Sequence, residues 1–176
     1  MILDATLETI KALLIENNLK LSCAESCTGG LVSSYFTDIS GASEFIEQNF
    51  VTYSNEAKTK ILNVKPKTLE TYGAVSEEVA YQMAVGLLNY ADTSVATTGI
   101  LGPTGGSKEK PIGLCYMGFG FKTDGENVIK VVKFNSAVVP SKYDNKRKEI
   151  KVDIATNAIT FYKNFLADCI KKRKET

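Results

Sequence analysis

The sequence contains no histidine, and this absence removes a whole set of chemistries at once. It excludes His-ligated zinc or iron sites, Ser-His-Asp and Cys-His catalysis, and proton transfer through imidazole. Any acid–base step must therefore use lysine, tyrosine, cysteine or a carboxylate.

The sequence also lacks an excess of charge and a long apolar run. Lys and Arg number 21 against 20 Asp and Glu, so the chain has no general electrostatic footprint for nucleic acid or an anionic membrane. No stretch approaches the ~20 apolar residues of a membrane span. Segment 1–17 carries Asp4, Glu8 and Glu16 and lacks the basic start of a signal peptide. We therefore expect a cytoplasmic protein with neither a nucleic-acid nor a membrane partner.

Cysteine usage gives no sign of a disulfide framework or a metal site. The four cysteines contain no Cys-x-x-Cys pair. Cys23 and Cys27 would make a poor zinc half-site, because Cys115 and Cys169 stand alone and no histidine is available. We expect reduced thiols, no bound metal and no cofactor.

The length and composition predict one folded domain that covers residues 1–176. The chain is 44% hydrophobic and 23% charged, which is typical of a soluble globular protein. Apolar periodicity, helix-start signals and β-rich runs predict the individual elements. Helices are expected at 4–17, 31–38, 56–62, 77–91 and 144–171, and strands at 19–24, 45–53, 93–98, 113–121 and 127–134. A hairpin turn is expected at 123–125 and a frayed basic tail at 171–174. This mixture predicts an α/β fold, a three-layer α/β/α sandwich with a mixed sheet.

The first chemical motif is Ala-Glu-Ser-Cys-Thr-Gly-Gly at 24–30, between a predicted strand and a predicted helix. A serine in such a turn lies at the carboxyl end of the sheet, where open α/β folds bind ligands. Gly29 and Gly30 would let backbone N–H groups approach an anion or a developing oxyanion. Alternatively, Ser26 and Thr28 only cap the helix. Cys27 is a rival nucleophile or redox-active thiol, or a small buried hydrophobic residue.

The second motif is Val-Thr-Tyr-Ser-Asn-Glu-Ala-Lys at 51–58. If Ser54 or Asn55 caps a helix, Lys58 lies near its N-terminus, where the helix dipole disfavours a positive charge. Partial burial would lower its pKa further, toward the range of a general base. In a chain without histidine, a Ser-Lys or Ser-Tyr-Lys arrangement with Tyr53 is the main remaining way to activate Ser26. The alternative is an ordinary exposed lysine.

The third motif is the glycine-rich stretch at 97–106, which contains four glycines and one proline. A loop of this kind directly after a strand can present backbone amides to phosphate or ribose. It can equally be a tight structural crossover.

Together these motifs resemble the CinA C-terminal domain family. The resemblance rests on 24–30, 50–58, 73–76 (Gly-Ala-Val-Ser), 98–106 and 110–113 (Lys-Pro-Ile-Gly). Members of that family include nicotinamide-nucleotide amidohydrolases, which convert nicotinamide mononucleotide and water to nicotinate mononucleotide and ammonia in pyridine-nucleotide salvage. The resemblance implies a metal-free amidase with a three-layer α/β/α fold that is often a homodimer. The additional N-terminal domain of longer members does not fit within this chain.

At matching positions, the resemblance implies that Ser26 is the nucleophile and that Lys58 and Tyr53 activate it and transfer protons. Other matching positions would bind the mononucleotide and the oxyanion; they are Thr28, Gly29, Gly30, Thr98, Gly99, Gly102, Gly105, Gly106 and Arg147.

The sequence departs from the family pattern in three places. The usual Gly-Asp-Arg is Asn-Lys-Arg at 145–147, segment 137–143 looks like an insertion, and Leu101 replaces the usual alanine of the glycine loop. These departures concern the substrate pocket more than the nucleophile. The alternative function is a nucleotide-binding regulatory module of the competence- and damage-inducible type, without catalysis.

Overall fold

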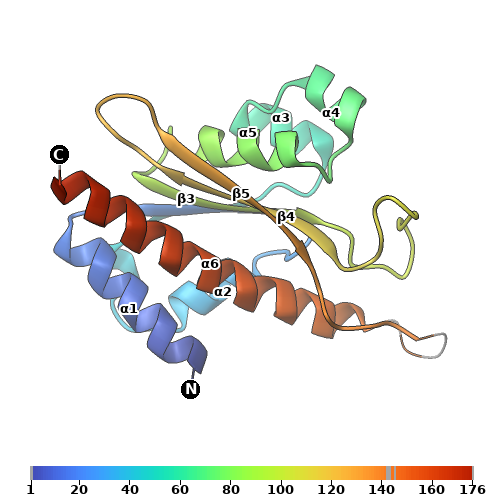
Figure 1. Cartoon of the computed structure of the whole chain (residues 1–176), viewed down its shortest axis with the longest axis horizontal. Coiled ribbons are helices and arrows are strands. Elements are labelled where there is room, and N and C mark those ends of the chain that lie inside the picture. The colour runs from blue at the N-terminus through green and yellow to red at the C-terminus, as the bar shows by residue number, and fades with distance from the viewer. Residues whose placement is uncertain (1, 142–143, 145, 176) are drawn as a thin grey trace.

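A five-stranded mixed sheet with helices on both faces forms the three layers that the sequence predicts (Figure 1). The structure is a computed structural model and describes residues 2–141, 144 and 146–175. The strands are β1 Leu21–Glu25, β2 Ile46–Val51, β3 Thr93–Gly99, β4 Leu114–Phe121 and β5 Val128–Asn135. The helices are α1 Ile2–Glu16, α2 Leu31–Thr37, α3 Asn55–Leu62, α4 Pro66–Tyr72, α5 Glu77–Leu87 and α6 Arg147–Glu175, with a short 3-10 turn η1 at Ala42–Glu44.

The strand order β2-β1-β3-β4-β5 places the carboxyl ends of three strands at one edge. β1 pairs in parallel with both β2 and β3, whereas β4 and β5 are antiparallel to their neighbours. The chain leaves β1 for β2 on one side and later returns to β3 on the other side. This reversal creates the crevice in which open α/β sheets bind ligands.

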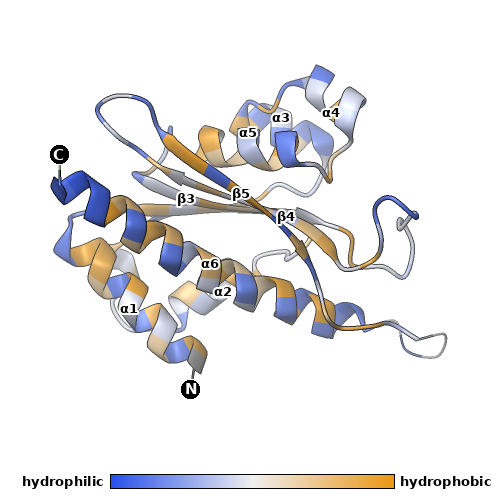
Figure 2. Cartoon of the chain, in the orientation of Figure 1, coloured by the Kyte–Doolittle hydropathy of each residue, from blue (hydrophilic) through white to orange (hydrophobic). Residues whose placement is uncertain are grey.

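Two apolar clusters hold the helical layers to the sheet. The larger one joins α1, α2 and α6 to one face, and the smaller one joins α3, α4 and α5 to the other. The apolar sides of these helices face the sheet, while the last turns of α6 are strongly hydrophilic (Figure 2). β1 is buried along its whole length, as expected of a central parallel strand, and β5 has exposed residues at alternate positions toward its ends, as expected of an edge strand.

Side-chain caps start two of the helices on the second face. The Ser54 hydroxyl accepts a hydrogen bond from Ala57 N–H at the start of α3, and the Ser76 hydroxyl accepts one from Val79 N–H at the start of α5. None of the described helices combines the length and the apolar character needed to cross a membrane.

The structure corrects several predicted boundaries. Helix α4 was not predicted, since its seven residues carry a weak apolar pattern and begin with a proline, which fits the first helical turn. The helix expected to continue to residue 91 ends at Leu87, and the basic segment expected to fray is helical as far as Glu175. The predicted insertion at 137–143 includes positions 142 and 143, which lie outside the described residues.

Gly86 lets α5 touch the end of the helix that carries Lys58. A Cβ atom at Gly86 would lie 2.1 Å from the carbonyl oxygen of Leu62. We therefore expect Gly86→Ala to lower the free energy of unfolding by about 1–3 kcal/mol through overpacking, as measured by urea denaturation. Gly125→Ala is the matched control, because nothing lies within 4 Å of its Cβ position. Equal stability of the two variants would contradict the close packing of α3 on α5.

Candidate active site

Three segments far apart in the sequence meet at the carboxyl edge of the parallel strands. Ser26 directly follows β1, Thr52 and Tyr53 directly follow β2, and Thr98 and Gly99 end β3. The parallel pairing of β1 with β2 and β3 therefore brings the first, second and third sequence motifs together.

The centre of this edge is a buried serine–lysine pair. Lys58 Nζ lies 3.1 Å from Ser26 Oγ, and only 1% of the Lys58 residue is exposed. Nζ also donates to the carbonyl oxygens of Thr52 at 2.9 Å and Tyr53 at 3.1 Å. The exposed-lysine alternative is wrong, because Lys58 is one of the largest fully buried side chains in the protein.

The surroundings of Lys58 suit a neutral amine. Burial lowers the pKa of Lys58, and nearby Cys27 opposes this effect to a smaller extent. A neutral amine has two N–H donors and one lone pair. The two carbonyl groups would match the donors of a neutral amine and leave its lone pair for the hydroxyl of Ser26, whereas an ammonium would donate to all three oxygens. No carboxylate forms an ion pair with Lys58 among the described residues.

The turn after β1 is held by hydrogen bonds that differ from the predicted ones. Ser26 N–H donates to Thr97 O at 3.0 Å, and the Thr28 and Thr97 hydroxyls lie 2.8 Å apart. Gly29 N–H donates to Ser26 O, and Gly30 N–H donates to the carboxylate of Glu25. The two glycine amides that the sequence suggested for an oxyanion are therefore already occupied.

Two other amides of the turn are available instead. Within the described part of the chain, the N–H groups of Cys27 and Thr28 donate to no protein acceptor. Cys27 follows Ser26 directly and lines the adjoining pocket, so its N–H lies where a backbone oxyanion site next to a serine nucleophile is expected, whereas Thr28 is fully buried. The positive φ angles of Gly29 (60°) and Gly30 (100°) allow the tight path of the chain after them.

A pocket of about 300 Å³ opens onto the serine–lysine pair. Eight of the predicted site residues line it, namely Ser26, Tyr53, Lys58, Thr98, Gly99, Gly102, Gly105 and Arg147. The lining formed by the described residues does not include Thr28, Gly29, Gly30 or Gly106. The rest of the lining consists of Ile100, Leu101 and Thr104 of the predicted glycine loop, Cys27, and two residues without a predicted role, Ala74 and Val75.

Tyr53 and Arg147 form the outer part of this pocket. The Tyr53 residue is 62% exposed, and its hydroxyl lies 3.4 Å from Arg147 Nη2. Arg147 Nη1 also donates to the carbonyl oxygen of Gly102 in the glycine loop. Among the described residues, the Tyr53 hydroxyl has no hydrogen bond with Ser26 or Lys58. Its backbone carbonyl, rather than its hydroxyl, contacts the pair in this structure.

The glycine loop owes part of its composition to packing. The Thr98 hydroxyl donates to Ala74 O at 2.7 Å, which ties the end of β3 to the segment before α5. A Cβ atom at either Gly102 or Gly106 would lie 2.9 Å from the Ile112 side chain. Both predicted roles of this loop, structural crossover and pocket wall, are therefore compatible with the geometry.

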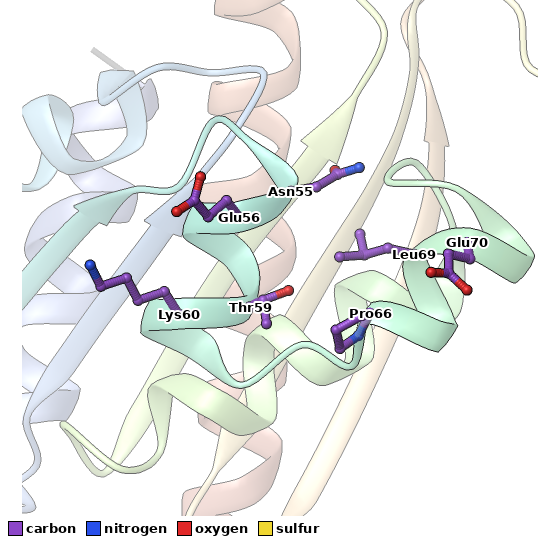
Figure 3. A pocket seen from close by; sticks show the side chains of 7 residues that line it. All are labelled: Asn55, Glu56, Thr59, Lys60, Pro66, Leu69 and Glu70. Atoms are coloured by element: carbon purple, nitrogen blue, oxygen red, sulfur yellow. The ribbon is translucent and has the colours of Figure 1, made fainter.

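A larger hollow of about 480 Å³ lies between α3 and α4 but contains no residue of the pair (Figure 3). Its α3 side is formed by Asn55, Glu56, Thr59 and Lys60 and its α4 side by Pro66, Leu69 and Glu70. It shares helix α3 with the site, but Lys58 is buried on the side of α3 away from solvent.

The fold and the site define an α/β domain that holds a buried serine–lysine pair at the carboxyl edge of its sheet. The model of the CinA C-terminal domain family matches residues 3–166, and the chain belongs to this family. The resemblance predicted from the motifs is thereby confirmed.

Similar proteins carry two kinds of name. The chain is 48% identical over 138 residues to a CinA-like protein of Chlorobium limicola, covering 76% of this chain and 32% of the relative. It is 53% identical over 104 residues to a nicotinamide-nucleotide amidohydrolase PncC of Enterobacter agglomerans, covering 58% of this chain and 63% of the relative. The chain thus spans less than two thirds of the length of these curated relatives.

Solved structures confirm the fold over nearly the whole chain. The competence/damage inducible protein CihA of Agrobacterium tumefaciens is 36% identical with a TM-score of 0.79, covering 90% of this chain and 92% of that one. The competence damage-inducible protein A of Klebsiella pneumoniae is 28% identical with a TM-score of 0.79, covering 94% of this chain and 97% of that one.

The depressed pKa of Lys58 predicts a pH-dependent contribution to stability. Between the lowered pKa and the ordinary value of 10.5, the unfolded chain binds a proton at Lys58 that the folded chain does not bind. The contribution of Lys58 to the free energy of unfolding therefore increases as the pH rises through this range. We expect wild type to become more stable relative to Lys58→Met as the pH rises from 7 to 10, as measured by urea denaturation. Lys60→Met, an exposed lysine of the same helix, should show no such trend; a trend of equal size there would contradict the assignment.

Proposed function

We propose that this protein hydrolyses the carboxamide of nicotinamide mononucleotide to nicotinate mononucleotide and ammonia, with Ser26 as nucleophile and without a metal. The observation that carries the proposal is the 3.1 Å approach of Ser26 Oγ to the buried Lys58 amine. The name of the Enterobacter relative, a nicotinamide-nucleotide amidohydrolase, supports the choice of amide.

The reaction proceeds in two halves. Neutral Lys58 accepts the proton of Ser26 as Oγ attacks the carboxamide carbon, and the new oxyanion is stabilised by the N–H group of Cys27, which lines the pocket. The Lys58 ammonium then gives its proton to the departing amine, so that ammonia leaves and an ester to Ser26 remains. Water attacks this ester while Lys58 takes its proton, and Ser26 is regenerated when Lys58 returns that proton to Oγ. Lys58 provides the proton transfer and the Cys27 amide provides the charge stabilisation, so no step calls for a metal.

The rim of the pocket is suited to the charged part of the substrate. Arg147 is the cationic side chain in the lining, and its guanidinium can bind a phosphate with two parallel hydrogen bonds. Tyr53, beside Arg147, would pack against the pyridine or ribose ring. We place the protein in the cytoplasm as a homodimer that acts in pyridine-nucleotide salvage.

Removal of either member of the pair should abolish turnover. We expect Ser26→Ala to lower kcat by about 10³-fold or more. Lys58→Arg keeps a permanent positive charge and so cannot accept a proton, and we expect it to lower kcat by about 10²- to 10⁴-fold. The measurement is ammonia release from nicotinamide mononucleotide. In wild type, kcat/KM should rise with pH as Lys58 loses its proton, at a pH below 10.5.

Undiminished turnover in Ser26→Ala would remove the proposed nucleophile. Calorimetric binding of the mononucleotide by wild type without any product would instead favour the regulatory binding module. Lys60→Arg, on the exposed side of α3, is the matched control for the lysine substitution.

Arg147 should affect binding more than chemistry. We expect Arg147→Gln to raise KM about 10-fold or more, because a hydrogen bond to a charged group contributes about 1.5–3 kcal/mol, while kcat changes little. Lys148→Gln, the exposed neighbour on α6, should leave KM unchanged. A fall in kcat alone for Arg147→Gln would contradict the proposed phosphate contact.

A further inference from the structure

Glu25 is a fully buried carboxylate that the reaction described above does not use. Its exposed fraction is 0% although it is adjacent in sequence to Ser26. No lysine or arginine forms an ion pair with it among the described residues. A carboxylate taken out of water in this way is costly unless hydrogen bonds replace its hydration.

Four hydrogen bonds replace that hydration, and all come from the start of the following helix. One oxygen, Oε2, accepts from the N–H groups of Gly30 and Val32 at 3.0 Å each. The other, Oε1, accepts from Ser33 N–H at 2.8 Å and from the Ser33 hydroxyl at 2.7 Å. The carboxylate therefore satisfies the N–H groups that the beginning of α2 leaves without an intrahelical partner.

These bonds close a ring around the turn that contains the serine. The backbone of Glu25 is fixed in β1, where its carbonyl accepts from Thr52 N–H at 2.9 Å. Its side chain accepts hydrogen bonds from Gly30, Val32 and Ser33. The four residues 26–29 are therefore held between the backbone of Glu25 and the residues bound by its side chain. This 26–29 turn contains Ser26, whose Oγ faces Lys58, and the N–H groups of Cys27 and Thr28, which donate to no protein acceptor among the described residues.

We infer that Glu25 is a positioning residue, whose buried carboxylate holds the 26–29 turn so that Ser26 Oγ faces Lys58 Nζ and the Cys27 and Thr28 amides stay free. This inference rests on the proposed serine mechanism but not on the identity of the amide. A reacting group displaced by 1 Å loses up to about 10²-fold in rate. The effect of Glu25 is therefore expected in the reactivity of Ser26 and not in substrate affinity.

The test uses a fluorophosphonate probe, so that the result does not depend on which amide the protein hydrolyses. Ser26 Oγ forms a bond to phosphorus, fluoride leaves, and Lys58 takes the serine proton; mass spectrometry follows the labelled peptide. We expect Glu25→Gln to label about 10- to 100-fold more slowly than wild type, because one amide nitrogen then faces N–H donors. In parallel, kcat for the proposed substrate should fall with KM unchanged.

The pH dependence of the labelling rate distinguishes a positioning role of Glu25 from an electrostatic effect of its charge on Lys58. We expect the labelling rate of Glu25→Gln to rise with pH at the same midpoint as wild type but to a lower plateau. A midpoint displaced toward lower pH with the plateau retained would overturn the inference, since Glu25 would then act by its charge on Lys58.

Two further variants keep the test decisive if Glu25→Gln does not fold. Ser33→Ala removes the shortest donor but keeps the carboxylate, and we expect it to label about 2- to 5-fold more slowly, since a single hydrogen bond is lost. Asp92→Asn is the matched control, because Asp92 accepts from Lys20 N–H next to the amino end of β1, at the opposite edge of the sheet. It should lower the melting temperature and leave labelling unchanged.

The outcomes are distinct for the two proposals. Wild-type labelling speed in folded Glu25→Gln, or in Ser33→Ala where Glu25→Gln does not fold, would overturn the positioning role. Efficient labelling of wild type without ammonia release would reject nicotinamide mononucleotide as substrate and leave the role of Glu25 intact. Absence of labelling in wild type would contradict an activated Ser26 and the positioning role with it.

Discussion

Burial of the Lys58 amine is the constraint on which the site depends. Removing an ammonium group from water without a carboxylate partner disfavours its charged form and lowers its pKa, and the described residues provide Lys58 with no carboxylate partner. They provide instead the carbonyl groups of Thr52 and Tyr53, which the chain leaves free as it turns away from the sheet after β2. Each carbonyl needs a donor because buried backbone groups are rarely left unpaired. The lysine and the end of the strand therefore stabilise one another, and the arrangement holds Nζ within hydrogen-bond distance of Ser26 Oγ.

The opposite side of Ser26 carries the complementary feature, a buried carboxylate whose hydration is replaced by the N–H groups at the start of α2. Glu25 and Lys58 lie on the two sides of the serine, and most of the hydrogen bonds of each are to backbone groups. Hydrogen bonds to backbone groups fix the position of a side chain more firmly than a contact between two long side chains does. The strands and helix starts that supply these backbone groups are themselves held by the core. The serine is thus located between two side chains that have little freedom to move.

Periodicity and turn signals predict the layers, the mixed sheet and the hairpin, whereas the pairing of Ser26 with Lys58 follows from the resemblance to the family and from the absence of histidine, which leaves lysine among the few available bases. The sequence does not predict that Gly29 and Gly30 have occupied amides, since the partner of Gly30 is a side chain that residue types alone assign to no role. An acidic residue shortly before a helix start is the signal that points to Glu25, through its favourable interaction with the helix N-terminus. Helix α4 is not predicted for a different reason. Its seven residues form too few helical turns for a periodic pattern of apolar residues to be recognised.

The position of Glu25 also constrains where a charged ligand can bind. A helix N-terminus normally attracts phosphate, and a glycine-rich turn before α2 suggests such a site. Here the carboxylate of Glu25 already accepts from those N–H groups, so a second anion there would meet like charge and find no free donor. Arg147 lies at the rim of the pocket, held by the Gly102 carbonyl and near the Tyr53 hydroxyl. In the proposed complex the phosphate would therefore lie toward α6 beside Arg147, and the carboxamide would point inward toward Lys58 and the Cys27 amide.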